Sequence, residues 1–353
     1  ALAAPAAVSA AGNTSDVSGS HVFMFKSVGN AFGVIMYEGF SSYMEQVGEN
    51  CTEKSPAETT VAAQVQLIDE AITQGCKSIS ISTNGDTGFD EVFAKAQEKG
   101  VPIVSVDSSA SADYRVTHNN QASTEDIGAM QVRAAVLQVL GVAYDPEDVT
   151  MEKTVEAALA DYDGDEIRLG VLSAGIDTPV QNGWIAVMEK ELQKDIYKGK
   201  VSPELNKKYG DDEATKSTTQ AQAFLAENNV DAIISPTTVG IAAAGEVLTQ
   251  AKSDIKLTGL GLPSEMVEYT GDDDAHSCPY FYLWDMQGLG KLSAYTTIAL
   301  INGDITGAKD DKFTAGDLGD YTITDADDGG TEVVLGAPLK FDTSNIEEMA
   351  KLY

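Results

Sequence analysis

The stretch from Val230 to Asp285 constrains the fold more than any other part of the chain. It contains three apolar runs of strand length, VDAIIS, IKLTG and YFYLW, which stop at Pro, Gly or Asp. An Ala-rich run with helical spacing follows the first of them. The order strand, tight loop, helix is typical of an open parallel sheet, in which such loops gather at the carboxyl ends of the strands and ligands bind there. We therefore expect the rest of the chain to supply a second, opposing wall.

Length and charge limit the classes of protein. The chain has 353 residues, of which 43% are hydrophobic, so it can bury a large core and its length favours two domains. No apolar run approaches the ~18 residues of a membrane span. A formal net charge of −32, from 55 acidic and 23 basic residues, would repel phosphate backbones and anionic membranes. We expect no nucleic-acid partner.

The N-terminus indicates an exported protein only indirectly, and the cysteines indicate no metal site. Residues 1–20 are small and polar without periodicity, which predicts a flexible leader: the remnant of a secretion signal or the spacer behind a removed or lipidated anchor site. Cys51, Cys76 and Cys278 fit no metal-binding spacing. A Cys51–Cys76 disulfide stays open as an alternative, and buried thiols are favoured.

The same order of strands and helices occurs twice. The first series has strands at His21–Phe25, around Cys51, in KSISIS, in PIVSV and at Arg115–Asn119, with helices after Phe32, over Ala57–Gln74 and over Phe89–Lys99. The second has a helix over Thr124–Leu140, a loose acidic surface insertion over Asp145–Glu166, strand IRLGVLSAG, a helix containing QNGWI, an edge strand in VSPELNKKYG, a helix over Thr218–Asn228 and then Val230–Asp285, which closes its sheet. A helix over Gln287–Ile301 should return to the first domain, and the tail reads as a strand pair and a capped final helix that cross back.

This pattern predicts an α/β protein of two doubly wound parallel-sheet lobes joined by several crossings. We place the leader at 1–20, the N-terminal lobe at 21–121 with 285–333, and the C-terminal lobe at 122–284 with 334–353.

The common catalytic motifs are missing. His21, His118 and His276 are not in HExxH spacing, and there is no GxSxG, GxxxxGK[ST] or GxGxxG sequence. We interpret His118 as a structural surface histidine rather than a base. DYDGDE resembles the start of a calcium loop but lacks an acid at the twelfth position. We expect no enzyme activity, no cofactor and no metal.

Polar side chains instead follow the predicted strands, next to aromatic ones. These residues are Lys26, Asn84, Asp107, Gln181 and Asp285, with Phe32 and Trp284. Carboxylates and amides bind sugar hydroxyls in pairs, and a sugar ring packs its C–H face on an aromatic ring. The set predicts a site for a small neutral polyol. Phe32 could equally staple the start of its helix.

Several longer motifs resemble the sugar-binding proteins of ABC importers with the ribose-binding-protein type of fold. The similarity covers about Val22 to Tyr353 and is closest to the branch of rhamnose-binding and autoinducer-2-binding proteins. The motifs that carry it are VFMFKSVGNAFG, AAQVQLIDEAITQG, VPIVSVDS, QNGWI, SPTTVGIAAAGEVL, TGLGLPSEM and YLWDMQGLGKLSAY. This resemblance implies the type 1 periplasmic binding protein fold, with three crossovers and hinge closure on a ligand held between the lobes.

The resemblance also implies ligand contacts. Autoinducer-2 receptors of this branch bind through a Lys, two Asp, a Gln, a Pro and an Ala. Lys26, Asp107, Gln181 and Pro236 match four of these positions, whereas Val180 stands where the second Asp is expected and Thr238 stands for the Ala. PTTVGIAAA is typical of the rhamnose type. We therefore predict a deoxyhexose such as rhamnose as the ligand, with autoinducer-2 as the alternative.

We predict a non-catalytic receptor that presents its ligand to an ABC permease. It should be a monomer, exported, and either periplasmic or anchored to the cell surface by a lipid. Two alternatives from other classes stay open: the sensing domain of a repressor and an enzyme with two α/β lobes. The repressor would need a basic helix-turn-helix before the first strand, and residues 1–20 contain no Lys or Arg.

Overall fold

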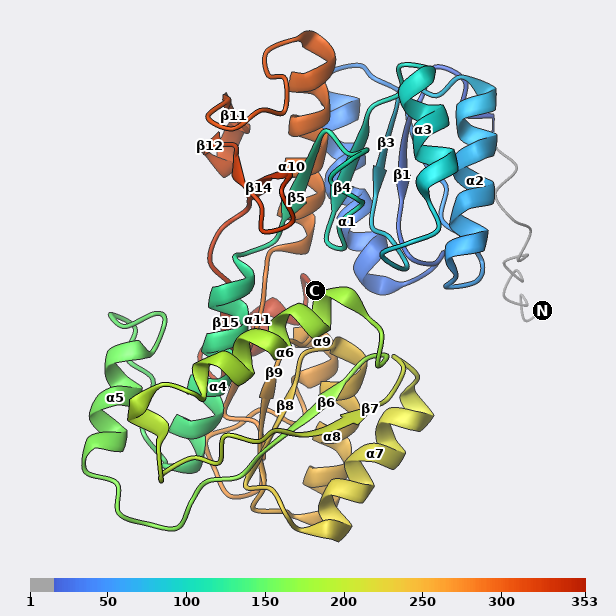
Figure 1. Ribbon diagram of the computed structural model, residues 1–353. Coiled ribbons are helices and arrows are strands. Elements are labelled where there is room, and N and C mark those ends of the chain that lie inside the picture. Colours follow the sequence, from blue (N-terminus) through green and yellow to red (C-terminus); the bar gives the residue numbers. More distant parts are fainter. Residues whose placement is uncertain (1–15) are drawn as a thin grey trace, which may run out of the picture. The chain divides into compact units, whose positions relative to one another are not determined.

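The computed structural model describes residues 16–353, which form two compact units. Among the described residues, the N-terminal unit comprises 16–121 together with Asp285–Leu335, and the C-terminal unit comprises Ala122–Trp284 and Gly336–Tyr353. Within the described residues the chain passes from one unit to the other after Gln121, after Trp284 and after Leu335. Figure 1 shows the elements of both units.

The N-terminal unit contains a seven-stranded sheet with the order β13-β14-β5-β4-β3-β1-β2 among the described residues. Its strands are β1 (His21–Met24), β2 (Cys51–Glu53), β3 (Ser78–Ile81), β4 (Ile103–Val106), β5 (Thr117–Asn120), β13 (Thr324–Asp325) and β14 (Thr331–Val334). All neighbours pair in parallel except β13, which is antiparallel to β14. A separate hairpin joins β11 (Lys312–Thr314) to β12 (Asp320–Thr322), with a short 3₁₀ turn, η2 (Gly316–Leu318), between them.

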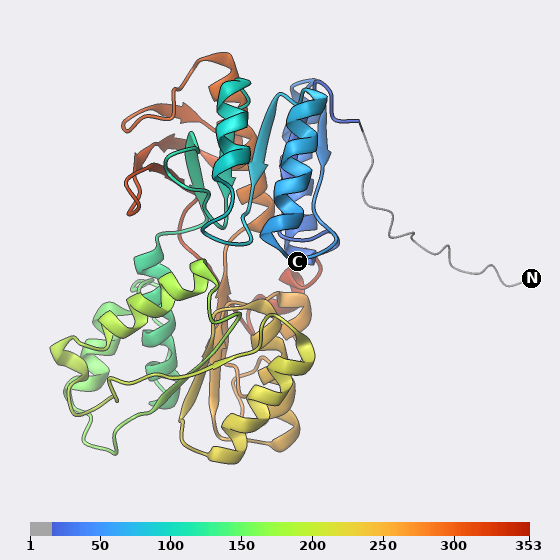
Figure 2. The same cartoon turned by 45° about the vertical axis from the view of Figure 1, so that its right-hand side comes forward.

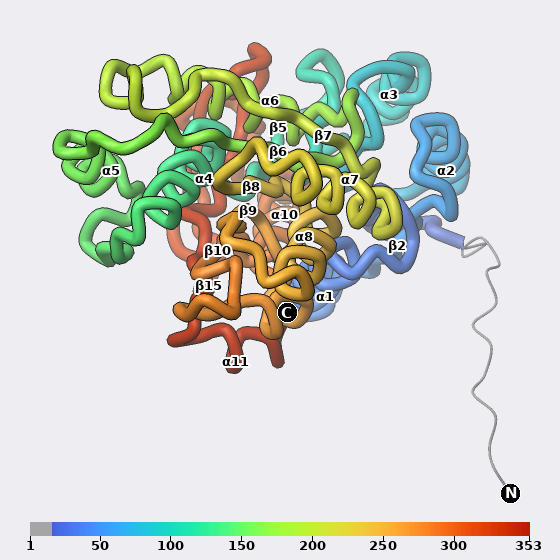
Figure 3. Tube along the Cα trace, turned by 90° about the horizontal axis from the view of Figure 1, so that it is seen from below, coloured from blue at the N-terminus to red at the C-terminus, as the bar shows by residue number. Residues whose placement is uncertain are grey.

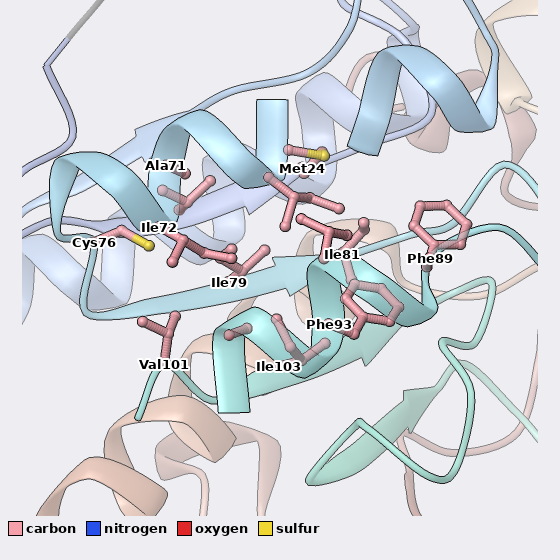
Figure 4. Packing of buried hydrophobic residues seen from close by; sticks show 14 of the residues in the cluster. Met24, Ala71, Ile72, Cys76, Ile79, Ile81, Phe89, Phe93, Val101 and Ile103 are labelled. Atoms are coloured by element: carbon pink, nitrogen blue, oxygen red, sulfur yellow. The ribbon is translucent and has the colours of Figure 1, made fainter. Parts of the chain in front are cut away.

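Helices cover both faces of this sheet, so β1, β3 and β4 are buried on both sides, although β3 also buries serines and β5 (THNN) is polar. Helices α2 (Val61–Gln74) and α3 (Asp90–Glu98) cover one face, and α1 (Ala31–Gln46) and α10 (Met286–Asn302) cover the other (Figure 1). Alternate strand residues face opposite ways: Met24 joins the core beneath α2 and α3 (Figure 4), whereas the ring of Phe23 lies 5.3 Å from that of Phe40 on α1.

Two glycines let α1 and α10 approach each other closely. A Cβ placed on Gly39 would lie 1.9 Å from the carbonyl oxygen of Gln287, and one on Gly290 would lie 1.8 Å from that of Met36. The backbones themselves are in contact, so neither position accepts a side chain. This close packing fixes α10 against the sheet directly after the second crossing.

The C-terminal unit has a four-stranded parallel sheet in the order β7-β6-β8-β9. Its strands are β6 (Leu169–Ser173), β7 (Asn206–Tyr209), β8 (Ala232–Ser235) and β9 (Lys256–Gly259). Figure 2 shows α4 (Thr124–Val139) and α6 (Pro179–Glu191) on one face, with α7 (Ala214–Glu227) and α8 (Thr238–Ala251) on the other. Figure 3 likewise shows α7 beside α8, which together close that face of the sheet.

Smaller elements complete the unit. They are α5 (Glu152–Ala160), η1 (Asp195–Tyr197), α9 (Pro263–Met266), β10 (Tyr280–Leu283), β15 (Leu339–Asp342) and α11 (Ile346–Met349). The prediction of two doubly wound parallel sheets is confirmed, including the edge position of β7. β10, however, does not extend the four-stranded sheet as predicted. It pairs antiparallel with β15, and it meets the end of β9 through a bridge between Leu260 and Tyr282 and a hydrogen bond from Thr258 Oγ1 to the Tyr280 carbonyl.

Other predictions need correction. The leader prediction falls mainly outside the described residues, but it is wrong for residues 16–20, because Val17 is fully buried and its N–H donates to Gln74 Oε1 at 3.1 Å. The segment Asp145–Glu166 is not a loose surface insertion throughout: α5 buries Val155 and Leu159.

The predictions also misplaced the starts of two helices, the pairing of the tail strands and the cap of the final helix. Helix α2 begins at Val61 rather than Ala57, since Thr60 caps it, and α7 begins at Ala214 rather than Thr218. The tail strands β14 and β15 are not a pair, because each joins a different unit. The final helix has no side-chain cap, since the Asn345 carboxamide accepts from Asp342 N instead.

The cysteines are unpaired. Cys76 and Cys278 are buried and Cys51 is half-buried, so the alternative Cys51–Cys76 disulfide is not formed. Burial raises the pKa of Cys76 to about 11. Burial likewise raises the pKa of Cys51 and of Cys278, which favours the protonated form of all three thiols near neutral pH.

Candidate functional site

Each sheet has one position at which the strand order reverses. In the N-terminal unit the chain goes from β1 to β2 on one side and to β3 on the other, and in the C-terminal unit it goes from β6 to β7 and then to β8. The loops after the strands diverge there, and ligands of open α/β sheets bind in the resulting crevice at the carboxyl ends. We call the polar residues at these two places the Lys26 edge and the Gln181 edge, and describe each by itself.

The Lys26 edge is built around Asp107. Strand β4 ends at Val106, and Asp107 follows with a left-handed backbone, φ 62°. Its side chain is buried, and the Oδ2 atom lies 3.1 Å from the Nζ atom of Lys26, the second residue after the end of β1. A buried carboxylate requires such partners because an unpaired charge in this position would be strongly destabilising.

Two further donors hold the same carboxylate. Ser82 Oγ donates to Asp107 Oδ2 at 2.9 Å and itself accepts from Ser108 N at 3.2 Å, so it orients both the side chain and the loop after β4. Gln121 Nε2 donates to Asp107 Oδ1 at 3.3 Å. The carboxylate is thus held by donors from three different segments, including the residue that precedes the first crossing.

Sequence reasoning did not identify Ser82 or Gln121. Ser82 ended an Ile/Ser alternation that predicted only a strand, and Gln121 was assigned to the crossing. Since both contacts span the fold, at separations of 25 and 14 residues from Asp107, no local pattern marks them. A polar residue at the end of a buried strand was the one available signal.

Asn84 supports the loop of Lys26. Its Nδ2 donates to the Lys26 carbonyl at 2.9 Å and to the Thr60 carbonyl at 3.4 Å, and its own N–H donates to Gln64 Oε1 at 2.8 Å. Gln64, fully buried on α2, also donates to the Ser82 carbonyl at 2.8 Å. Both protons of Asn84 Nδ2 are used in these bonds. The main role of Asn84 is therefore to fix the loop that carries Lys26.

Phe32 occupies the first turn of α1, half-buried, with its ring 5.6 Å from that of Phe25. Asn30 Oδ1 caps this turn by accepting from Phe32 N at 3.0 Å. The Phe25 ring also lies 5.8 Å from Lys26 Nζ. The Phe25 ring therefore borders Lys26, and Phe32 packs against Phe25.

His118 is buried on β5, which corrects its prediction as a surface histidine. Its Nδ1 lies 2.9 Å from Ser105 Oγ. Burial, together with the charge of Arg115, lowers the pKa of His118 to about 4. The imidazole is neutral near pH 7 and belongs to the sheet, which favours a structural role.

The Gln181 edge combines residues after β6 and β8. Gln181 lies in the first turn of α6, 8% exposed, and its Nε2 donates to the Pro236 carbonyl at 3.3 Å. Within residues 16–353 its Oε1 atom has no hydrogen-bond partner. Thr238 is the first residue of α8, directly after the Pro236 loop. The structure thus brings Gln181, Pro236 and Thr238 together.

Trp284 and Asp285 lie on either side of the second crossing. The Trp284 ring is 5.8 Å from the ring of Trp184 in the C-terminal unit. Asp285 caps α10 in the N-terminal unit, where its Oδ1 accepts from Gly288 N at 2.8 Å. One carboxylate oxygen of Asp285 therefore has a helix-capping function.

Neither edge resembles a metal site. Within residues 16–353 no three His, Cys, Asp or Glu side chains are grouped so that they could hold a metal ion. No helix in the same part of the chain has the length and hydropathy needed to cross a membrane.

Comparisons with known proteins identify the family and the fold of this chain. A family model described as a periplasmic binding protein domain matches residues 21–305. The structure of an ABC transporter solute-binding protein from Clostridium phytofermentas with bound L-rhamnose is 38% identical, with a TM-score of 0.82, covering 95% of this chain and 99% of that one.

Two further structures are similar. A sugar ABC transporter protein from Actinomyces odontolyticus is 31% identical, with a TM-score of 0.71, covering 94% of this chain and 98% of that one. LsrB from Clostridium saccharobutylicum in complex with AI-2 is 22% identical, with a TM-score of 0.76 over 93% of this chain and 99% of that one. At that identity it supports the fold alone.

Proposed function

Because this chain belongs to the periplasmic binding protein domain family, we propose that it is the solute-binding receptor of an ABC importer and that its ligand is a small neutral sugar, a deoxyhexose such as L-rhamnose. The observation that carries the proposal is the similarity, at 38% identity over nearly the whole chain, to a solute-binding protein with bound L-rhamnose. The family is one of receptors, so we propose no catalytic step.

The Lys26 edge supplies the chemistry that a sugar requires. Lys26 and Asp107 present a donor and an acceptor 3.1 Å apart, a spacing that suits hydroxyls, which both donate and accept. Bonds to charged groups contribute about 1.5–3 kcal/mol each, against ~1 for neutral pairs. The salt bridge is also electrically neutral, which favours a neutral ligand over an anion.

The Gln181 edge adds neutral groups. The unpartnered Gln181 Oε1 can accept from a hydroxyl, and the Pro236–Thr238 backbone offers further polar groups. Phe32 and Trp284 would pack on the C–H face of the sugar, and Asn84 and Asp285 would contribute to the same site. We propose that one ligand engages both edges, with closure about the three crossings.

Membership of this family supports a proposal for the cellular setting. We propose that the protein is exported, acts in the periplasm or on the cell surface behind a lipid anchor, and delivers its ligand as a monomer to ABC permease subunits. The division into lobes at 21–121 with 285–333 and 122–284 with 334–353 would place the hinge at the crossings. Sedimentation of the purified chain with and without sugar would test the monomer.

A thermal-shift screen over pentoses, deoxyhexoses and autoinducer-2 tests the ligand. A tight ligand at about 100 times its dissociation constant adds about 2.7 kcal/mol to the stability of the folded state, so L-rhamnose or another deoxyhexose should raise Tm clearly. If Tm rises with autoinducer-2 alone, autoinducer-2 replaces the deoxyhexose as the proposed ligand and the receptor function stands. If no compound raises Tm, the proposal is contradicted.

The alternative, an enzyme with two α/β lobes, would convert the sugar instead of only binding it. Incubation with a labelled deoxyhexose followed by chromatography should return the sugar intact if the chain is a receptor. Conversion of the label at a rate that depends on the protein would favour the enzyme with two α/β lobes.

A further inference from the structure

The Gln181 edge contains a carboxylate that the sequence did not indicate. Gln181, Pro236 and Thr238 are neutral, but the structure adds Asp212 from the loop after β7. The hydroxyl of Thr237, between Pro236 and Thr238, donates to Asp212 Oδ1. The edge is therefore formed by the loops after β6, β7 and β8 together.

A tight turn places Asp212 there. Glu213 N donates to the Gly210 carbonyl at 2.9 Å, and the two central residues, Asp211 and Asp212, have φ angles of 54° and 52°. Positive φ at both central positions is the pattern of type I′ turns, which Asp and Asn tolerate. Asp211 N donates to the Ala174 carbonyl at 3.3 Å, which ties the turn to the end of β6.

The two neighbouring acids have different partners. Asp211 Oδ2 lies 3.1 Å from Lys216 Nζ on the first turn of α7, so its charge is compensated at the surface. Asp212 is turned instead to Thr237 of the β8 loop, and it is exposed to solvent. Only the second carboxylate belongs to the edge at which the strand order reverses.

The edge has acceptors in excess. Thr237 is joined through the adjacent Pro236 carbonyl to Gln181 Nε2, 3.3 Å away, so Asp212, Thr237 and Gln181 form one polar series. Gln181 Oε1 is buried without a partner within residues 16–353, and the Thr237 bond leaves further acceptor positions on the Asp212 carboxylate. The buried Gln181 Oε1 atom can therefore accept from a ligand hydroxyl, and the exposed Asp212 carboxylate can accept from a second one.

We propose that Asp212 is a ligand-binding residue that accepts a hydrogen bond from a hydroxyl of the sugar. The inference rests on the proposed function and adds a determinant of specificity to it. Asp107 is paired with Lys26, so Asp212 together with Asp285 makes the combined charge of the proposed ligand-binding residues negative. Phosphorylated and carboxylated sugars are repelled and neutral polyols are retained.

The test compares Asp212→Asn with the matched control Asp211→Asn. Both variants remove one negative charge from the same turn, and asparagine tolerates the left-handed backbone. Titration calorimetry of the full chain with L-rhamnose should show a dissociation constant raised about tenfold or more for Asp212→Asn and within about twofold of wild type for Asp211→Asn. Thr237→Val, which leaves the charge but removes its hydrogen bond, should weaken binding by a smaller factor.

Three results would overturn the inference. If Asp212→Asn binds L-rhamnose as tightly as wild type while unfolding at the same temperature, the carboxylate makes no ligand contact, and the proposed function stands. If both aspartate variants lose affinity equally, the loss comes from the reduced negative charge of the turn and not from a hydrogen bond between Asp212 and the sugar. If wild type binds neither L-rhamnose nor any sugar in the thermal-shift screen, the proposed function fails together with the inference.

Discussion

Replacing Asp107 with asparagine tests the Lys26 edge with little disturbance of the fold. Asparagine keeps the shape of the side chain and tolerates φ 62°, whereas alanine would add backbone strain of about 1–2 kcal/mol. Lys26, which loses its counter-ion, is 22% exposed and can stay hydrated. We therefore expect the variant to fold, with a free energy of unfolding lowered by about 1–3 kcal/mol.

The effect on affinity follows from counting acceptor positions. A carboxylate offers about four, and three are used, two on Oδ2 by Lys26 and Ser82 and one on Oδ1 by Gln121. One position on Oδ1 is left for a sugar hydroxyl. Losing a bond of about 1.5–3 kcal/mol to a charged acceptor corresponds to a dissociation constant raised about 10- to 150-fold.

Titration calorimetry with the sugar that gives the largest thermal shift measures this directly. Urea unfolding of the same samples separates affinity from stability. Asp113→Asn, an exposed aspartate of the same unit, is the control and should bind like wild type. A dissociation constant for Asp107→Asn within twofold of wild type, in a folded variant, would refute the assignment of Asp107 to the ligand.

Two further predictions concern stability. Gly290→Ala should lower the free energy of unfolding by about 3 kcal/mol or more in urea, because its Cβ would lie 1.8 Å from the Met36 carbonyl oxygen, whereas Gly183→Ala, with its nearest contact at 3.6 Å, should be neutral or stabilising by up to ~1 kcal/mol. Equal effects would contradict the packing argument. Burial and the charge of Arg115 lower the pKa of His118 to about 4. Below about pH 6.5 the unfolded chain therefore binds a proton at His118 that the folded state does not bind. The contribution of His118 to stability is complete above that pH and falls as the pH decreases towards 4. The free energy of unfolding should fall by about 2 kcal/mol between pH 7 and pH 5 in wild type and by less in His118→Gln. An identical fall in that variant would show that His118 is not the source of the pH dependence.

The strand and helix order could be read from periodicity because each element buries its own faces. The Ile/Ser alternation predicted β3, and the strand, loop and helix around Pro236 were placed within a few residues. The errors arose where distant contacts override local pattern. Residues 16–20 look like a leader, yet Val17 packs into the N-terminal unit, and β10 pairs with β15, almost 60 residues later in the chain.

The candidate site divides in the same way. Lys26, Asp107 and Gln181 were suggested by polar residues at strand ends, and Pro236 and Thr238 by resemblance to a family. Asp212 carried no signal, because an aspartate in a Gly-Asp-Asp turn reads as an ordinary surface turn.

Composition, charge and hydrophobic spacing alone determined that this is an acidic α/β protein with two series of parallel strands, since those properties depend only on neighbours along the chain. Tertiary structure decided which polar side chains meet. Gln181 reaches the Pro236 carbonyl across 55 residues, and Ser82 reaches Asp107 across 25. Such contacts depend on the spatial order of the strands, and that order is set by packing between elements which no local pattern records.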